Sequence, residues 1–172
     1  MRTISSALAL LLALASPAAA FELKSPDIAD GQRMSKAQVY TRCGGDNVSP
    51  ALEWNGAPTG TKSFVLTMID QDVSPSQWSH WIVVDLPAGT TALAHNDSLP
   101  DGAHGIVSNF GDASYDGPCP PIRTGLHHYR ITVWAMPTAM VSLPANVNAQ
   151  DLAAQLAHQA IGSASLTGTY QR

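Results

Sequence analysis

Three stretches of the chain have the hydrophobic pattern of buried β-strands. They are residues 63–69, 81–86 and 128–136, each short and rich in β-branched and aromatic residues. A proline follows each stretch within a few residues, and a central strand does not tolerate proline. The pattern therefore predicts three strands.

One amphipathic helix is predicted near the C-terminus, over residues 150–161. Leu152 and Leu156 lie four residues apart on one face, and Gly162 stands where a C-cap is expected. Residues 88–126 are rich in Gly, Pro, Asn and Asp and are long for a connection, so we expect a functional loop or further short strands there. Strands first and a helix last predict a mainly antiparallel β domain with a peripheral helix.

The first twenty residues have the features of a secretory signal. Arg2 supplies a positive charge, residues 4–15 are almost wholly apolar, and residues 18–20 are alanines suited to a signal peptidase. The apolar stretch is too short to span a bilayer of about 30 Å, and nothing amphipathic supports the alternative of a buried N-terminal helix. We expect cleavage after Ala20, one domain over residues 21–172, and a periplasmic or secreted protein without integral membrane association.

Composition narrows the class of protein. The chain has 172 residues, of which 45% are hydrophobic and 13% charged. These values are typical of neither a disordered segment nor a coiled coil. The formal charge is −4 and basic runs are missing from the sequence, so we exclude nucleic acid as a partner.

The chain has two cysteines, Cys43 and Cys119. An even number in an exported protein favours a disulfide. Closing a loop of about 77 residues would stabilise the fold by roughly 4 kcal/mol. A reactive thiol and a shared metal site are the alternatives, although neither cysteine has a Cys-x-x-Cys or Cys-x-x-His neighbour.

Polar residues stand where the apolar stripes of the first and third predicted strands end. Since side chains two residues apart share a face, the stripe of the first strand continues to Asp70 and Asp72. The stripe of the third strand leads back to Tyr129 and His127. An unpaired buried polar atom costs roughly 1–3 kcal/mol, so we expect these ends to meet in a small polar pocket.

The second predicted strand adds a histidine to this pocket. Its apolar stripe consists of Ile82, Val84 and Leu86 and leads back to His80. Taken singly, a buried His is more typical of a satisfied core residue and Asp-x-Asp of a turn. The coincidence of three strand ends favours a site. The opposite face of the third strand is expected to be solvated: His128, Arg130 and Thr132.

The segment Tyr115–Pro121 is the other unusual feature. It contains three prolines and a cysteine in seven residues, which makes it nearly rigid. It is either a stiff turn or a preformed wall of a ligand site.

These segments, in this order, resemble the phosphatidylethanolamine-binding protein family, and within it the bacterial Raf-kinase-inhibitor-like proteins. The motifs that carry the resemblance are residues 45–54, 70–72, 78–81, 115–121, 127–129 and 168–172. The resemblance implies an antiparallel β-sandwich with Greek-key connections and a C-terminal helix. It also implies a non-enzymatic binding protein with one small pocket for phosphate-like groups, including phospholipid headgroups.

The resemblance assigns ligand-binding positions to Asp70, His80, Tyr115, Pro121, His127 and Tyr129. We add Asp72 to this set of ligand-binding positions because it continues the inward-facing stripe of the first predicted strand. The family has Asp-Pro-Asp-Ala-Pro where this chain has Asp-Gln-Asp-Val-Ser-Pro over residues 70–75. The change loosens the turn and leaves the position of Asp72 open.

The expected ligand is a phosphate monoester or a zwitterion, held weakly by a histidine that an aspartate orients. Affinity should rise as the pH falls from 8 to 6. No cofactor, metal or catalytic residue is expected, because the sequence has neither a His-Glu-x-x-His nor a Gly-x-Ser-x-Gly motif. The alternative is a protease or kinase inhibitor that acts through surface loops at residues 74–78 or 88–104.

Overall fold

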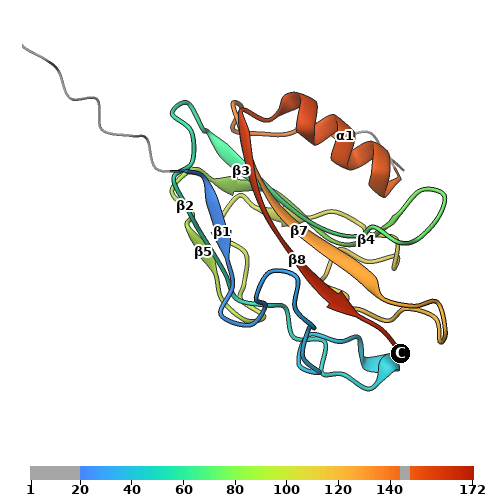
Figure 1. The fold of residues 1–172 in the computed structure, drawn as a ribbon. Helices are drawn as coiled ribbons and strands as arrows, with labels where there is room; N and C mark the ends of the chain where they lie inside the picture. The colour runs from blue at the N-terminus through green and yellow to red at the C-terminus, as the bar shows by residue number, and fades with distance from the viewer. Residues whose placement is uncertain (1–19, 144–147) are drawn as a thin grey trace, which may run out of the picture.

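The computed structural model describes residues 20–143 and 148–172, drawn in Figure 1. The predicted signal sequence lies outside the described residues except for Ala20, so its cleavage and the single domain over residues 21–172 stay predictions. The elements are β1 (Glu22–Lys24), the 3-10 helix η1 (Thr41–Cys43), β2 (Leu52–Asn55), β3 (Ser63–Asp70), β4 (Trp78–Pro87), β5 (Ala92–Leu93), β6 (His104–Gly105), β7 (His127–Met136), α1 (Ala149–Gln159) and β8 (Gly162–Tyr170).

The strands form two antiparallel sheets. The larger sheet has the strand order β6-β4-β3-β7-β8, and the smaller has the order β1-β2-β5. The three predicted strands are β3, β4 and β7, the centre of the larger sheet. In Figure 1 the smaller sheet lies on one side of the larger sheet and α1 on the other. The predicted mainly β fold with a peripheral helix is therefore confirmed.

Two apolar clusters hold these layers together. The main core joins the two sheets and includes Leu52 and Trp54 of the smaller sheet with Phe64 and Val133 of the larger. The second cluster lies between the larger sheet and α1: Val65, Ile82, Val84, Trp134, Met136, Leu152 and Leu156. Because both faces of β3 are covered, all eight of its residues are buried, which is why its sequence is a nearly continuous apolar run.

Strand β4 departs from regular alternation, and this corrects one prediction. Met68 of β3 pairs with Trp81, but Ile69 pairs with Ser79, so His80 is an extra residue in a β-bulge. The bulge turns His80 to the face of Trp81, in the main core. The prediction that His80 shares a face with Ile82 and Val84 is wrong, because those two residues pack beneath α1.

The C-terminal region also differs from its prediction. The helix ends at Gln159 with Ala160 at its C-cap in extended backbone, and Gly162 is the first residue of β8 instead of a cap. Strand β8 was not predicted and pairs with β7 along nine residues. On the outer face of β7, Thr132 is buried, contrary to prediction, whereas Arg130 is exposed. Among the described residues, no helix is long and apolar enough to cross a membrane.

Candidate functional site

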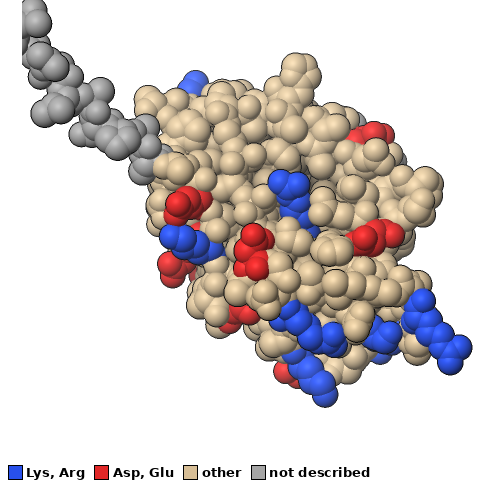
Figure 2. Space-filling view, in the orientation of Figure 1, with Lys and Arg blue, Asp and Glu red and all other residues tan. Residues whose placement is uncertain are grey.

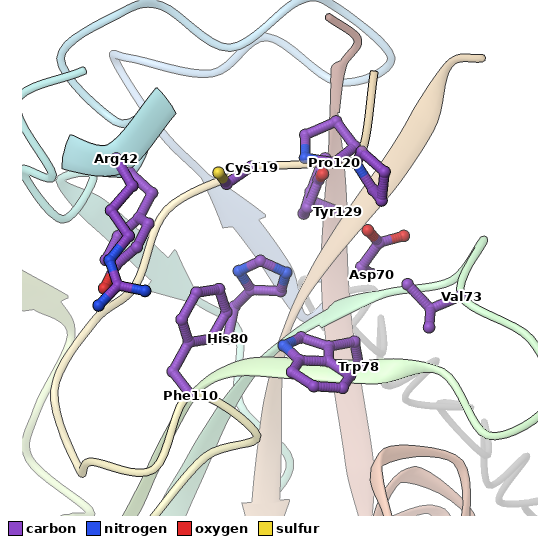
Figure 3. Close-up of a pocket in the computed structure, with 11 residues that line it drawn as sticks. Arg42, Asp70, Val73, Trp78, His80, Phe110, Cys119, Pro120 and Tyr129 are labelled. Atoms are coloured by element: carbon purple, nitrogen blue, oxygen red, sulfur yellow. The ribbon is translucent and has the colours of Figure 1, made fainter. Parts of the chain in front are cut away.

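A cavity of about 380 Å³ opens at the end of the larger sheet where β3 ends and β7 begins. Strand pairing positions its central residues, since Asp70 lies directly opposite Trp78 of β4 and Tyr129 of β7. Figure 3 shows Asp70, His80 and Tyr129 together, with Arg42 on the other side of the His80 ring from Asp70. The lining residues are Tyr40, Arg42, Asp70, Val73, Trp78, His80, Phe110, Cys119, Pro120, Pro121 and Tyr129.

Asp70 is buried and paired with a histidine behind it. Its Oδ1 accepts the backbone N–H of Asp72 at 3.0 Å, and its Oδ2 lies 2.7 Å from His127 Nδ1. The Thr124 hydroxyl donates to Pro121 O at 2.8 Å and lies 2.9 Å from His127 Nε2. Both ring nitrogens of His127 are therefore occupied, and its ring is not part of the cavity lining. His127 therefore contacts Asp70 from behind the cavity wall.

His80 faces the cavity in its neutral form. Its Nδ1 lies 2.7 Å from the Asp116 carbonyl oxygen, so Nδ1 carries the proton and Nε2 has a free lone pair. Burial lowers the pKa of His80 to about 4, against smaller raising effects of the Asp116 hydrogen bond and the Asp70 charge. With this pKa, His80 should stay neutral between pH 8 and pH 6. A rise in affinity over this range stays a prediction, and it would not come from this histidine.

Tyr129 supplies an unused hydrogen-bonding group. Its side chain is fully buried and lines the cavity, and its hydroxyl has no hydrogen-bond partner among the described residues. Burial, the negative charge of Asp70 and the closeness of the hydroxyl to that carboxylate raise its pKa above the ordinary range, so the hydroxyl stays protonated and can donate. A buried polar atom without a partner costs free energy that a ligand would recover.

Besides His127, two further predicted site residues are not part of the cavity lining. Asp72 turns to the surface, where its Oδ2 accepts from the backbone N–H of His128 at 2.6 Å and lies 2.9 Å from the ring Nδ1. The Tyr115 hydroxyl donates to Gln38 O at 2.8 Å, and its ring packs against Trp81 in the main core. Neither residue lines the cavity. Pro121, by contrast, is in the lining as predicted.

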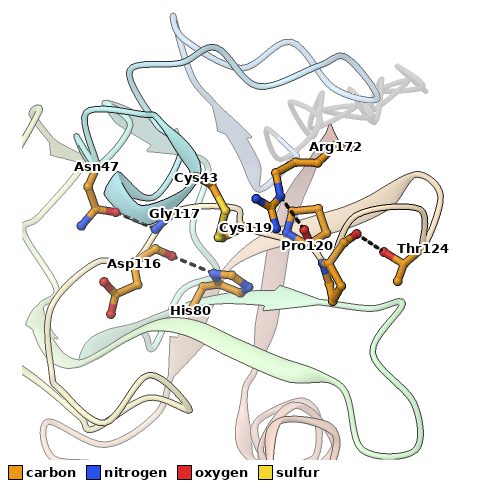
Figure 4. Close-up of a disulfide and its surroundings, with 10 residues drawn as sticks. Cys43, Asn47, His80, Asp116, Gly117, Cys119, Pro120, Thr124 and Arg172 are labelled. Atoms are coloured by element: carbon orange, nitrogen blue, oxygen red, sulfur yellow. Dashed lines mark hydrogen bonds between the residues drawn. A yellow bond between two sulfur atoms is a disulfide. The ribbon is translucent and has the colours of Figure 1, made fainter.

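The disulfide Cys43–Cys119 is present and joins the two segments that wall the cavity (Figure 4). Cys43 ends η1, and Cys119 belongs to the proline-rich segment. The Asn47 side chain adds two hydrogen bonds, to Tyr115 O at 3.1 Å and from Gly117 N–H at 2.8 Å. A side chain at residue 117 would run into the backbone carbonyl of Gln38, so only glycine allows this close approach.

Several residues of the cavity lining were not predicted from the sequence, and two of them lie next to the disulfide. Tyr40 and Arg42 precede Cys43 and line the cavity, and the Tyr40 ring packs against Phe110 with centroids 5.1 Å apart. Trp78 stands two residues before His80, so one further step along the strand would have found it. The predicted disulfide could have identified Tyr40 and Arg42, because it holds the residues next to Cys43 against the proline-rich segment at the cavity.

Charge at the cavity is uneven. Arg42 is the one Lys or Arg in the lining, and it is exposed. A second arginine lies close by, since Arg172 Nε donates to Pro120 O at 2.8 Å. Figure 2 shows several Lys and Arg side chains gathered at the end of the molecule where Figure 1 places η1 and the C-terminus. The carboxylate of Asp70 lies deep, and positive charge lies at the rim.

The chain belongs to the phosphatidylethanolamine-binding protein family. The sequence model of that family matches residues 24–171, nearly the whole described chain. The predicted family is therefore confirmed.

Individual proteins are also similar to this chain along most of its length. The chain is 35% identical to the UPF0098 protein YbcL of Escherichia coli, over 98% of this chain and 96% of YbcL. It is 36% identical to LppC of Mycobacterium tuberculosis, which is named as a candidate lipoprotein, over 91% of this chain and 76% of LppC.

Two solved structures share the fold. The crystal structure of E. coli YbcL, described as a new member of the mammalian PEBP family, matches with a TM-score of 0.81 and covers 90% of this chain and 99% of that one. A phosphatidylethanolamine-binding protein homologue of Chlamydia trachomatis, CT736, is 30% identical with a TM-score of 0.73, over 89% of this chain and 98% of that one.

Proposed function

We propose that this chain is a non-enzymatic binding protein that holds the phosphate group of a small phosphorylated or zwitterionic ligand, such as a phospholipid headgroup. The observation that carries the proposal is the Tyr129 hydroxyl, buried in the cavity wall without a partner among the described residues. Arg42 at the rim supplies positive charge, and hydrogen bonds to charged groups are the stronger ones. Family membership supports the same class of ligand.

The proposed ligand-binding residues are those that face the cavity and those that hold them. Asp70, His80, Tyr129 and Pro121 are proposed to contact the ligand, together with Arg42. His127 is proposed to position Asp70. With a single arginine, which is exposed, and no α-helix N-terminus among the lining residues, we expect weak affinity.

Removal of the Tyr129 hydroxyl tests the proposal. Phosphoethanolamine and inorganic phosphate are titrated into wild type and Tyr129→Phe, with affinity measured by calorimetry or by NMR shift changes. The lost hydrogen bond to a charged ligand should weaken binding about 10- to 100-fold, which corresponds to roughly 1.5–3 kcal/mol. The fold should be unaffected, because this hydroxyl has no partner to lose.

Tyr115→Phe is the matched control. Tyr115 is also a buried tyrosine, but its hydroxyl bonds to Gln38 O away from the cavity. This variant should lose a little stability and keep ligand affinity. If neither phosphate nor phosphoethanolamine binds the wild type, or if both variants bind alike, the proposal is wrong.

Inhibition of a protease or kinase is the second candidate. The loop at residues 74–78 that was predicted for this role ends at Trp78, a residue that is 38% exposed and lines the cavity. An exposed aromatic residue is typical of a protein contact. Inhibition through this loop should survive Tyr129→Phe and fall with Trp78→Ala, whereas ligand binding should respond most strongly to Tyr129→Phe.

We also propose that the protein works outside the cytoplasm, in the periplasm or after secretion. The intramolecular disulfide and the relative named as a candidate lipoprotein are consistent with this location. Fractionation of the native host, with an antibody against the folded domain, would test it. Recovery of the full 172-residue chain in the cytoplasm would contradict it.

A further inference from the structure

A second cavity lies between α1 and the outer face of the larger sheet. Its volume is about 450 Å³, within the roughly 300–1,000 Å³ of small-molecule sites. It shares no lining residue with the cavity around Asp70, and α1 lies on the opposite side of the larger sheet from the smaller sheet (Figure 1). The proposed phosphate site therefore leaves this cavity without a role.

The sheet contributes a face that changes from apolar to polar along its strands. Val65 on β3 pairs with Trp134 on β7, and both pack in the apolar cluster beneath α1. Two residues along, on the same face, Thr67 pairs with Thr132, and both line the cavity. The apolar contact with the helix therefore gives way to polar side chains at the cavity.

The helix contributes side chains that are too small to fill this space. Leu152 and Leu156 pack on the sheet, whereas the residues that follow them, Ala153 and Ala157, line the cavity. Since an alanine side chain is a single methyl group, a hollow remains beside the two leucines.

The polar groups of the lining have few partners in the protein. Trp134 Nε1 donates to the Thr67 hydroxyl at 3.0 Å, and the Arg130 guanidinium donates to Ser165 Oγ at 3.0 Å. Among the described residues, these are the hydrogen bonds that the lining side chains make. Thr132 is 4% exposed, so its hydroxyl is a nearly buried polar group that a ligand could satisfy.

Charge and hydrogen-bonding capacity indicate which ligand fits. Arg130 is the charged residue of the lining, and it has no ion pair among the described residues. A guanidinium binds a carboxylate through two parallel N–H···O bonds. The other polar side chains are neutral groups that both donate and accept, as the hydroxyl groups of a ligand do: Gln71, Gln77, Gln150, Thr132 and Ser163.

We propose that this cavity binds a small carboxylic acid that is rich in hydroxyl groups, such as a uronic acid. The carboxylate pairs with Arg130, and the hydroxyl groups bond to the amides and hydroxyls of the lining. The C–H face of the sugar ring packs against Trp134 and Ile69, which supply apolar surface in the lining. This site is separate from the proposed phosphate site, and neither proposal rests on the other.

Three probes separate the parts of this recognition: galacturonate, galactose and acetate. Each is titrated into the wild-type protein at pH 7 and followed by NMR. The indole N–H signal of Trp134, assigned by its loss in Trp134→Phe, reports on the cavity because Nε1 lies beside Thr67 there. Galacturonate should bind at least about 10-fold more tightly than galactose, which lacks the charge, and than acetate, which lacks the hydroxyl groups.

Arg130→Gln tests the charged contact. This variant should weaken galacturonate about 10-fold, to the level of galactose, because a hydrogen bond to a charged group is lost. Arg123→Gln is the matched control, since Arg123 is also exposed but lies outside this cavity. It removes the same net charge and should keep the preference. Arg130→Gln should also leave phosphoethanolamine binding unchanged.

Ala153→Leu tests the hollow itself. The larger side chain should occupy the space beneath the helix and weaken galacturonate at least about 10-fold. Ala154→Leu makes the same change at a neighbouring exposed position outside the cavity lining and should keep binding. Both residue types favour a helix, so α1 should persist in both variants. If Ala153→Leu does not fold, the probe series and the two arginine variants decide the question.

The outcomes either support the site or overturn it. A preference for galacturonate that Arg130→Gln abolishes and Arg123→Gln retains supports it. Equal affinity for galacturonate and acetate would show that charge alone is recognised, and the proposed ligand class would be wrong. If no probe shifts the Trp134 signal, the cavity is not a site for this class of ligand, while the proposed phosphate site is unaffected.

Discussion

Two aspartate–histidine pairs stand side by side at the same end of the larger sheet. The oxygen–nitrogen distance is 2.7 Å between Asp70 and His127 and 2.9 Å between Asp72 and His128. Their exposure differs widely: the side chains are 3% and 5% exposed in the first pair and 38% and 46% in the second. The same two residue types at neighbouring positions therefore form one buried pair, of which Asp70 lines the cavity, and one pair at the surface.

The largest predicted difference between the pairs is in stability. His127→Ala should lower the free energy of unfolding by about 3–5 kcal/mol, because it leaves a buried carboxylate without its partner. That loss is a large fraction of the roughly 5–15 kcal/mol by which a domain is stable. Urea or guanidinium unfolding at pH 7, with the disulfide intact and phosphate absent, measures it.

His128→Ala is the control for this experiment. The same substitution in the exposed pair should cost less than about 1 kcal/mol. Equal losses in the two variants would show that burial does not separate the pairs. A small loss in both would mean that Asp70 is stable without His127.

A buried histidine should also make the stability of the fold depend on pH in the acidic range. Burial lowers the pKa of His80 in the folded protein to about 4, below the value near 6.5 of the unfolded chain. Between these values the unfolded state binds more protons, so stability is fully present above about pH 6.5 and is lost as the pH falls toward 4. The loss amounts to about 3 kcal/mol.

His80→Gln isolates this contribution. Asp116 acts in the opposite direction, since burial and the charge of Asp112 raise its pKa to about 6, and its contribution is lost as the pH rises through that value. The quantity to measure is therefore the difference in unfolding free energy between wild type and His80→Gln at several pH values. A difference that stays constant from pH 6.5 to pH 4 would show that His80 is protonated in the fold.

The central strands of the sheet could be predicted because they are buried on both faces. Strands β3 and β7 pair in register from Ser63 to Asp70, so alternation correctly brought Asp70 and Tyr129 to one cavity. Strand β8 was missed because Ser, Gly and Thr fill most of its exposed positions and give a weak pattern. Its pairing with β7 determines its conformation more than its own sequence does.

The other site residues could not be placed from the alternation of apolar and polar positions along the strands. His80 reaches the cavity through a β-bulge, so its predicted place is right although the face assigned to its strand is wrong. Arg42 comes from a distant segment that the disulfide and the tight packing at Gly117 hold against the cavity. The ring contacts of His127 depend on Thr124, which no periodic pattern connects to it.

The smallest predicted effect concerns the exposed pair alone. Partial burial opposes ionisation of Asp72, but the hydrogen bonds from the backbone and ring of His128 outweigh it and hold its pKa below the usual range. A lowered carboxyl pKa stabilises the fold above the unfolded value of about 3.9 and loses that effect as the pH falls through the folded value. Asp72→Asn should therefore cost less than about 1 kcal/mol at pH 7 and nothing near pH 2.

Salt separates this small effect from that of the buried pair. At an ionic strength of about 1 M the screening length falls to about 3 Å, so the cost of Asp72→Asn should shrink while the cost of His127→Ala stays nearly unchanged. Unfolding curves of both variants at low and high salt make the comparison. A cost of Asp72→Asn that persists in high salt would mean that the backbone hydrogen bond to His128, and not charge, is what this carboxylate contributes to the turn after β3.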